Sequence, residues 1–419
     1  MLPIYNQFIQ FMRSGGDNVD LEEGYYWYDK GFIKFFSITG EIIIWGSLTV
    51  DDDLKPHVKP RYLKIRYTKE TWNDTALRMS KNLKKLEDES IKVIKEFNQK
   101  FNNHCKYVLS SEGKDSQVTF HLAQKVIPGI KKLFNNTTLD VPSTYKFVKS
   151  DPDVEAIITP KEGFYSYQKR RNLVPNRYIR FCCSVYKEGA LKDYMDKDTN
   201  CLFFLGMRKL ESAKRANYEY GWRNPVWGNR PWQGVLPILN WSDLDVWLYI
   251  IKNNIPFPMN YKLGYSRLGC AVACPYSSKL SWALDEYWLP TMRKRWMDII
   301  ERDFIDNNKW LNMNCTLAEY KLCWNSVPPR SEPNDEVIDE FCRYTGINRT
   351  EAVKFFSKKC PSCGKRVNNR NSIAMNLKFN GRGTDKFFCK KCFLKEYKMT
   401  EEEYNRYIET FKSQGCQLF

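Results

Sequence analysis

The chain has 419 residues, 42% of them hydrophobic and 15% aromatic, which is enough for two or three folded domains and excludes a wholly disordered chain. Lysine and arginine number 66 against 49 acidic residues, a formal net charge of +17, so nucleotides and nucleic acid are candidate partners. No stretch approaches the roughly 18 apolar residues of a membrane span, and the N-terminus lacks the pattern of a secretory signal, so we expect a soluble cytoplasmic protein without a membrane partner.

The first hundred residues form a section of their own. Aromatic, strand-like stretches at residues 25–28, 32–38 and 41–45 precede residues 71–101, in which apolar side chains recur at helical spacing. We predict an α+β section over residues 1–100, and no chemistry can be assigned to it.

From residue 106 the pattern changes to short apolar strands alternating with helices. Residues 107–109, 154–159 and 201–206 are continuous apolar runs, as expected for strands that are buried on both faces. The alternation predicts an α/β fold, a doubly wound parallel sheet with helices on both faces, over residues 101–285. A helical extension over residues 286–355 and a cysteine-bearing tail over residues 356–419 follow.

A phosphate-binding loop is predicted directly after the first of these strands. The segment Ser111-Glu-Gly-Lys-Asp-Ser116 opens a helix, where unsatisfied backbone N–H groups and the helix dipole attract anions. Lys114 adds a full charge, the hydroxyls of Ser111 and Ser116 can donate to phosphate oxygens, and Gly113 allows close backbone approach. The spacing is not that of a Walker A loop. The alternative interpretation is a turn that only caps the helix.

This segment resembles the PP-loop, Ser-Gly-Gly-Lys-Asp-Ser, of N-type ATP pyrophosphatases and of the phosphoadenosine phosphosulfate reductase family. It departs from that pattern at Glu112, where the family has a glycine, so the carboxylate has to point away from a bound phosphate. Asn136-Thr-Thr is similar to the family segment after the second strand, with Thr137 beside the nucleotide and Thr138 in place of a glycine.

Three further segments match the family in the same order. Arg180-Phe-Cys-Cys-Ser-Val-Tyr-Lys187 is similar to Arg-x-Cys-Cys-x-x-x-Lys, and Gly206-Met-Arg-Lys-Leu-Glu-Ser-Ala-Lys-Arg215 matches Gly-x-Arg-x-x-Glu-Ser-x-x-Arg at every fixed position. Residues 237–247 resemble a family helix, which we interpret as packing and not as part of a site. The resemblance implies an adenine-nucleotide α-hydrolase-like fold. It also implies a nucleotide site made of Ser111, Gly113, Lys114, Asp115, Ser116, Thr137, Arg180, Gly206, Arg208, Glu211, Ser212 and Arg215, with Lys114, Arg208 and Cys183 as catalytic residues.

Two sets of cysteines indicate metal chemistry. In adenylylsulfate reductases a Cys-Cys pair and a later Cys-x-x-Cys hold a 4Fe–4S cluster, and the resemblance implies the same for Cys182, Cys183, Cys270 and Cys274. Here the later pair has three intervening residues instead of two. Small buried apolar residues, a redox disulfide or a persulfide carrier are the alternatives.

The second set lies in the tail. Cys360-Pro-Ser-Cys363 and Cys389-Lys-Lys-Cys392 have the paired spacing of a tetrahedral zinc site. Its surroundings are basic, so the module either contacts nucleic acid or a partner or serves as a metal-stapled cap.

Three functions remain open on the sequence alone. The first is an ATP pyrophosphatase/sulfurtransferase that uses ATP and Mg²⁺ to adenylate a substrate, possibly nucleic acid, for sulfur transfer from a donor protein. The second is a phosphoadenylylsulfate or adenylylsulfate reductase that releases sulfite. The family's reductases carry Glu-Cys-Gly-Leu-His near the C-terminus, of which this chain shares only Cys416 and Leu418. The third is a non-catalytic nucleotide- or nucleic-acid-binding module.

Overall fold

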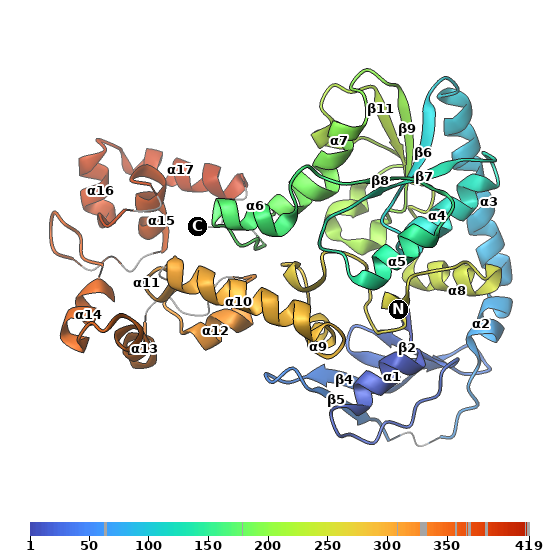
Figure 1. The fold of residues 1–419 in the computed structure, drawn as a ribbon, viewed down its shortest axis with the longest axis horizontal. Helices are drawn as coiled ribbons and strands as arrows, with labels where there is room; N and C mark the ends of the chain where they lie inside the picture. Colours follow the sequence, from blue (N-terminus) through green and yellow to red (C-terminus); the bar gives the residue numbers. More distant parts are fainter. Residues whose placement is uncertain are drawn as a thin grey trace. The chain divides into compact units, whose positions relative to one another are not determined.

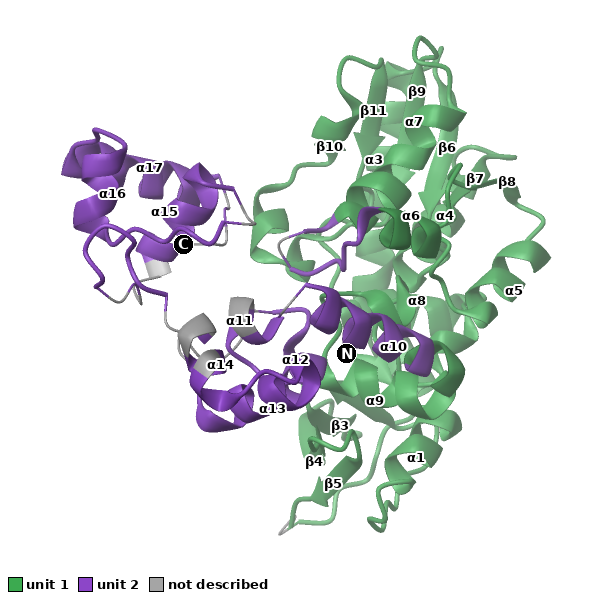
Figure 2. Cartoon of the chain, turned by 60° about the vertical axis from the view of Figure 1, so that its left-hand side comes forward, with its two compact units in different colours: residues 1–170, 181–293 green, residues 171–180, 294–419 purple. Residues whose placement is uncertain are grey.

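The computed structural model describes residues 1–62, 65–177, 179–307, 309–326, 333–356, 358–365, 367, 370–381, 384–414 and 416. The chain divides into two compact units, residues 1–170 with 181–293 and residues 171–180 with 294–419 (Figure 2). Within these described stretches, no helix combines the length and the apolar character needed to cross a membrane. The finer division into four sections remains a prediction.

The N-terminal section is a five-stranded antiparallel sheet with helices, as predicted. Its strands pair in chain order, and the side chains of Tyr26, Trp27, Ile33 and Phe35 are buried in its core. The elements are β1 (Leu2–Pro3), α1 (Asn6–Arg13), β2 (Tyr26–Asp29), β3 (Phe32–Phe36), β4 (Ile42–Val50), β5 (Pro56–Pro60), α2 (Trp72–Arg78) and α3 (Ser80–Lys100).

The rest of the first unit is built on a six-stranded, mostly parallel sheet, which confirms the predicted fold class. The strand order is β10-β11-β9-β6-β7-β8, and only the edge strand β10 is antiparallel to its neighbour. The strands are β6 (Cys105–Ser110), β7 (Lys131–Asn135), β8 (Val154–Ile158), β9 (Cys201–Leu205), β10 (Gly221–Trp222) and β11 (Trp232–Val235).

Apolar side chains cover both faces of this sheet because its strands are apolar at successive positions. Leu202 and Phe204 of β9 pack in one core with α3, α4 (Lys114–Gln124) and α8 (Asp243–Asn253). Cys201 and Phe203, which point the opposite way, pack in a second core with α7 (Ala190–Tyr194). Figure 1 shows helices on both sides of the strands.

The strand order reverses beside β6. The chain runs from β6 through β7 to β8 on one side, and β9 then pairs with β6 on the other side. In open α/β sheets, ligands bind in the crevice at the carboxyl ends of the strands where the order reverses. This places the expected site beyond the ends of β6 and β9, where the two most specific sequence motifs begin. Helices α5 (Pro142–Ser150), α6 (Phe164–Arg171) and α9 (Lys279–Trp288) complete this part of the fold.

The second unit is helical, as expected for the extension, and helices also form the tail, which the sequence predicted only as a zinc-ribbon-like four-cysteine module. Its cysteine-bearing end has a core of its own, which includes Met375, Phe388, Phe393 and Tyr404. The helices are α10 (Pro290–Asp306), whose first turn belongs to the first unit, α11 (Lys309–Met313), α12 (Leu317–Cys323), α13 (Asp335–Thr345), α14 (Arg349–Phe356), α15 (Arg370–Phe379), α16 (Lys390–Glu396) and α17 (Glu401–Ser413).

Candidate functional site

The predicted phosphate loop lies between the end of β6 and the start of α4. Gly113 is the N-cap of α4 and has no side chain to cap the first turn, so this helix start is open to an anion. A Cβ atom on Gly113 would lie 3.1 Å from the Tyr261 hydroxyl and 3.2 Å from Ser111 Oγ. The Tyr261 hydroxyl accepts a hydrogen bond from the Lys114 N–H at 3.0 Å, and Ser116 Oγ accepts one from the Ser111 N–H at 3.3 Å. The loop is therefore compact, and a side chain on Gly113 would crowd it.

Glu112 points away from the helix start. Its φ is +58°, a conformation in which the family's glycine would be free of strain. The side chain is fully buried, and Oε2 accepts hydrogen bonds from Lys132 Nζ at 3.0 Å and Gln117 Nε2 at 2.5 Å. Lys132, also fully buried, pairs with Asp151 as well. The Glu112 carboxylate therefore points away from a phosphate bound at the helix start, as the sequence requires, and Lys132 neutralises its charge.

Two cations and two carboxylates alternate at the start of α4. Lys114 Nζ lies 2.7 Å from Asp115 Oδ2 and 3.0 Å from Asp243 Oδ1. Arg208 Nε lies 2.7 Å from Asp115 Oδ1, and its Nη2 lies 2.7 Å from Asp243 Oδ1. Burial alone would raise the pKa of Asp243, but Lys114 and Arg208 outweigh it and hold that pKa well below its ordinary value. Asp243 is therefore ionised at neutral pH wherever these cations stay in place.

The position of Asp243 corrects one sequence interpretation. The helix that contains it, α8, was expected to serve packing alone. Its N-cap Ser242 and the later Asp245 do form the capping box that the sequence indicates. However, the first residue of the helix, Asp243, bridges Lys114 and Arg208. The packing interpretation overlooked it because a carboxylate in a first helical turn is also common without any further role.

The end of β9 fits closely against the start of α4. A Cβ atom on Gly206 would lie 2.6 Å from the backbone carbonyl carbon and oxygen of Asp115 and 2.8 Å from the Ser116 nitrogen. Only glycine allows this approach, and it places Arg208, two residues later, against Asp115. Glu211 Oε2 accepts a hydrogen bond from the Arg208 N–H at 3.1 Å and pairs with Arg215.

Other predicted residues lie apart from this charge cluster. Thr137 is buried after β7 and donates a hydrogen bond to Asp140 Oδ2 at 2.6 Å, while Thr138 adopts a φ of +58° where the family has glycine. Ser212 is exposed. Arg180 belongs to the second unit, so its part in a nucleotide site stays a prediction.

A cavity of about 240 Å³ opens at the carboxyl ends of β6, β7 and β9. Lys114 and Arg208 do not line it and are almost fully buried in their ion pairs. Its walls come from the phosphate loop, from the segment after β7 and from the segments that carry the first cysteine set. The lining residues include Ser111, Asn135, Thr137, Asp140, Lys187, Met207, Trp222, Trp227, Leu268 and Gly269.

The first cysteine set gathers around Lys187. The Cys182 thiol interacts with the thiols of Cys183 and Cys270, and Cys274 lies close enough to Cys270 for their charges to interact. The hydrogen bond from Cys182 lowers the pKa of Cys270 to about 7, against the effect of burial and with help from Lys187. Four sulfur donors beside the partly buried cation Lys187 fit the ligand chemistry of an anionic 4Fe–4S cluster, and the contact between the Cys182 and Cys270 thiols is also compatible with a disulfide or a sulfur carrier.

The second cysteine set is more compact. The Sγ atoms of Cys360, Cys363, Cys389 and Cys392 all lie within 4.8 Å of one another, and no other described group of three or more such donors does. The Cys360 N–H donates to the Lys365 carbonyl and the Gly364 N–H to the Cys360 carbonyl, both at 2.8 Å, which folds the first Cys-x-x-Cys turn around its sulfurs. Four thiolates at this spacing fit tetrahedral zinc, so the cluster is consistent with a zinc module.

The phosphoadenosine phosphosulfate reductase domain model matches residues 106–275. The chain is 30% identical over 210 residues to sulfate adenylyltransferase subunit 2 of Maricaulis maris and spans 68% of that protein. The chain belongs to the phosphoadenosine phosphosulfate reductase domain family.

Other members of this family differ in what their names state. An uncharacterized protein of Methanocaldococcus jannaschii is 26% identical over 287 residues, which is 67% of each chain. Adenosine 5'-phosphosulfate reductase of Salinibacter ruber is 24% identical over 38% of this chain and 63% of its own length. A crystal structure of phosphoadenylyl-sulfate reductase from Candida auris aligns with 50% of this chain and 98% of its own, at 17% identity and a TM-score of 0.34. The relatives with an assigned activity are thus named as a sulfate adenylyltransferase subunit and as an adenosine 5'-phosphosulfate reductase.

The structure adds residues that the family pattern did not single out. Asp243 and Tyr261 complete the surroundings of the loop, and Asp140 lines the cavity beside Lys187, which the family pattern does include. The Ser-x-x-Asp capping box pointed only to the start of α8, and nothing in the sequence around Tyr261 distinguishes it from a core tyrosine.

Proposed function

We propose that the chain is an ATP pyrophosphatase/sulfurtransferase, which adenylates a substrate and so prepares it for sulfur transfer. One observation carries the proposal: an uncapped helix start at Gly113 stands beside Lys114 and Arg208, both held by the carboxylates of Asp115 and Asp243. Backbone N–H groups and two fixed cations at one sheet edge are suited to a chain of phosphates.

The proposed reaction has two steps. A substrate oxygen attacks the α-phosphorus of ATP, the bond between the α-phosphorus and its bridging oxygen breaks, and pyrophosphate leaves with the electron pair. A sulfur nucleophile then displaces AMP from the substrate. Lys114 and Arg208 would exchange their carboxylate partners for phosphate oxygens and stabilise the developing charge. Mg²⁺ would be bound mainly through the phosphates, with Asp115 or Asp243 as an available oxygen ligand.

The relatives support adenylyl transfer. Sulfate adenylyltransferase subunit 2 names a protein that acts in transferring an adenylyl group, and it is among the more similar relatives with an assigned activity. Cys183, the predicted catalytic cysteine, and Cys270 both lie close enough to Lys187 for their charges to interact, and either could carry the transferred sulfur. The net charge of +17 supports a polyanionic acceptor such as nucleic acid.

The second candidate function is reduction of adenylylsulfate or phosphoadenylylsulfate. The specific observation in its favour is the gathering of Cys182, Cys183, Cys270 and Cys274 beside the cavity, together with relatives that are named adenosine 5'-phosphosulfate reductase. The third hypothesis, a non-catalytic nucleotide-binding module, was motivated by the carboxylate of Glu112 in the loop. That carboxylate is buried away from the helix start, so it gives the hypothesis no support.

The discriminating experiment uses anaerobically purified full-length protein, incubated in parallel with ATP plus Mg²⁺ and with adenylylsulfate plus a thiol reductant. Pyrophosphate release from ATP supports the first function, sulfite release supports the second, and the absence of both products supports a binding module. Iron and sulfide analysis of the same preparation tests whether the first cysteine set holds a cluster.

A further inference from the structure

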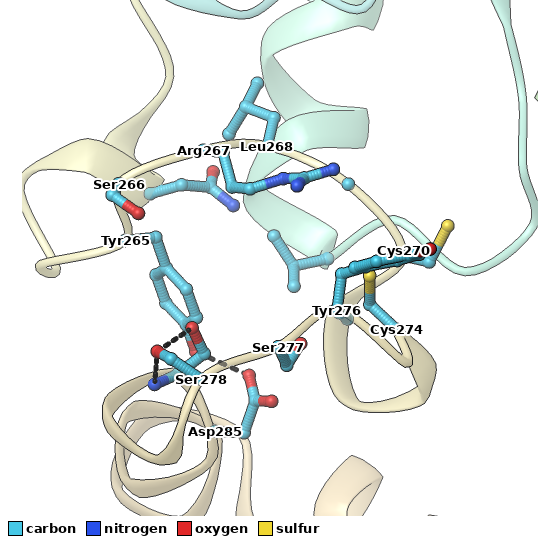
Figure 3. A pocket seen from close by; sticks show the side chains of 15 residues that line it. Tyr265, Ser266, Arg267, Leu268, Cys270, Cys274, Tyr276, Ser277, Ser278 and Asp285 are labelled. Atoms are coloured by element: carbon cyan, nitrogen blue, oxygen red, sulfur yellow. Dashed lines mark hydrogen bonds between the residues drawn. The ribbon is translucent and has the colours of Figure 1, made fainter. Parts of the chain in front are cut away.

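A second pocket of about 140 Å³ is bordered by residues 265–278, the cysteine loop that carries Cys270 and Cys274 (Figure 3). Leu268 and Gly269 line both this pocket and the nucleotide-side cavity, and Cys270 and Cys274 belong to the wall of the second pocket. A ligand bound here would be separated from the first cavity by one loop of the chain. The pocket is smaller than the nucleotide-side cavity of about 240 Å³, which favours a ligand smaller than a nucleotide.

One wall of the pocket carries a buried carboxylate with an unused oxygen. Asp285 is 1% exposed, and its Oδ1 accepts a hydrogen bond from the Tyr265 hydroxyl at 2.9 Å. Its Oδ2 is buried and has no hydrogen-bond partner among the described residues. Arg293 lies near enough to influence Asp285 electrostatically but forms no ion pair with it, and it faces Glu286 at 3.7 Å. Asp285 lines the pocket, and a buried carboxylate oxygen without a partner is a strong acceptor for a donor group that reaches it.

Arg267 supplies the opposite charge. Its exposed side chain lines the same pocket and extends toward the cysteines in Figure 3. Within the described part of the chain, Arg267 forms no ion pair. The cation Lys187 lies close enough to repel it electrostatically. The hydroxyl-bearing residues Ser266, Ser277, Ser278 and Ser281 also line the pocket. The pocket therefore offers an anion-binding group, an acceptor for a cation and several neutral hydrogen-bonding groups around a small volume.

We propose that this pocket binds a small amino acid, with the ammonium group on Asp285 and the carboxylate on Arg267. An ammonium ion can donate to Asp285 Oδ2, and a carboxylate can accept two parallel hydrogen bonds from the guanidinium group. The assignment rests on these binding groups alone and is independent of the proposed adenylation. Its consequence is that the chain brings a small zwitterion to the face of the cysteine loop opposite the nucleotide cavity.

The test is isothermal titration of the full-length protein at pH 8, without nucleotide. The probes are glycine, L-serine and L-cysteine, together with ethanolamine, which lacks the carboxylate, and glycolate, which lacks the amine. We expect at least one amino acid to bind with one-to-one stoichiometry and at least about tenfold more tightly than ethanolamine or glycolate, because each truncated probe loses a charge-assisted hydrogen bond.

Three variants complete the experiment. Asp285→Asn and Arg267→Gln should each weaken the amino acid by about tenfold or more, whereas Asp53→Asn, which removes a carboxylate from an exposed loop, should bind as the original chain does. Arg267 is exposed, so its variant reports on binding even if Asp285→Asn perturbs folding. Failure of all three amino acids to bind, or equal binding by the Arg267→Gln variant, would overturn the proposal. Neither outcome would affect pyrophosphate release from ATP, so this failure is distinguishable from failure of the proposed function.

Discussion

At the scale of single residues, Glu112 illustrates how the chain accommodates a departure from the family pattern. A non-glycine residue at a φ of +58° costs about 1–2 kcal/mol, and a buried carboxylate costs more unless it is paired. Lys132 provides that pairing from β7, and Asp151 provides a second negative charge on the same cation. Lys132 is thus the central residue of the network, because both carboxylates depend on it.

The first prediction compares the members of this network. Lys132→Met should lower the free energy of unfolding by about 3 kcal/mol or more, because the buried carboxylate of Glu112 and the partly buried carboxylate of Asp151 lose their shared cation. Glu112→Gln should cost about 1 kcal/mol, since Lys132 keeps Asp151 and the amide oxygen can still accept a hydrogen bond. Urea unfolding measures both, with Lys131→Met, on the same strand but partly exposed, as the control. Equal losses for the two core variants would contradict the account.

The second prediction concerns Asp285. Burial raises its pKa to about 7, although the hydrogen bond from Tyr265 and the charge of Arg293 act in the opposite direction and Glu286 adds to the rise. Because the folded-state pKa lies above the ordinary value of 3.8, the stabilisation from Asp285 is complete below about pH 4 and is lost as the pH rises through 7.

The Asp285→Asn variant removes this titration. Relative to the original chain, it should gain stability between pH 4 and pH 8, by up to about 4 kcal/mol. Thermal or urea unfolding across this range measures the difference. A difference that stays constant with pH would show that Asp285 keeps an ordinary pKa.

At the scale of elements, the contact between β9 and α4 positions the charge cluster. Gly206 lets the strand end meet the backbone of Asp115 and Ser116, and Arg208 reaches its two carboxylates from there. A methyl group at position 206 would collide with backbone atoms, which cannot move aside as a flexible side chain can.

The third prediction follows from this contact. Gly206→Ala should lower the free energy of unfolding by about 1–3 kcal/mol and weaken ATP binding, because the start of α4 has to shift. Gly163→Ala is a matched control, since its Cβ atom would meet only Thr138 Oγ1 at 3.9 Å. Urea unfolding and equilibrium nucleotide binding are the measurements, and a Gly206→Ala variant that matches the control in both would refute the close contact.

The sequence predicted those elements whose residues lie close together in the chain. The strand, the turn at Gly113 and the helix after it are one local pattern, and so are the two Cys-x-x-Cys turns. The sequence did not predict Asp243 and Tyr261 as site residues, because their contacts with Lys114 depend on how α8 and the loop after it pack against α4. The pairing of Glu112 with Lys132 likewise depends on the register of β7 beside β6, which periodicity alone does not determine.

At the scale of the whole molecule, the two compact units differ in what stabilises them. The first has extensive apolar cores on both faces of its sheet, while the core of the cysteine-bearing tail is a separate cluster of eight buried residues among those that the structure describes. A module of this size needs a staple, and four thiols within 4.8 Å of one another can provide it through zinc.

The fourth prediction is that the tail folds only with its metal. Elemental analysis should find about one zinc per chain attributable to this cluster, and Cys363→Ser should lose it, whereas Cys105→Ser, at an exposed cysteine of the first unit, should retain it. After chelation, limited proteolysis should cut within residues 358–414 and leave the first unit intact, because the sheet does not depend on the metal. A tail that stays resistant to protease after the zinc is removed would contradict this expectation.

The central claim is that Lys114 and Arg208 serve ATP cleavage at the α-phosphorus. The most direct measurement follows ATP labelled at the α-phosphate, with the acceptor supplied as total nucleic acid, and compares the original chain with Lys114→Met and Lys125→Met. Lys125 also forms an ion pair with a carboxylate, Glu87, but stands at the other end of α4. From the original chain and from Lys125→Met we predict pyrophosphate release and transfer of the labelled AMP group to the acceptor, from which a sulfur nucleophile frees it as AMP. Lys114→Met should lose about 100-fold or more in rate. Release of ADP and phosphate instead, or equal rates for the two lysine variants, would contradict the account.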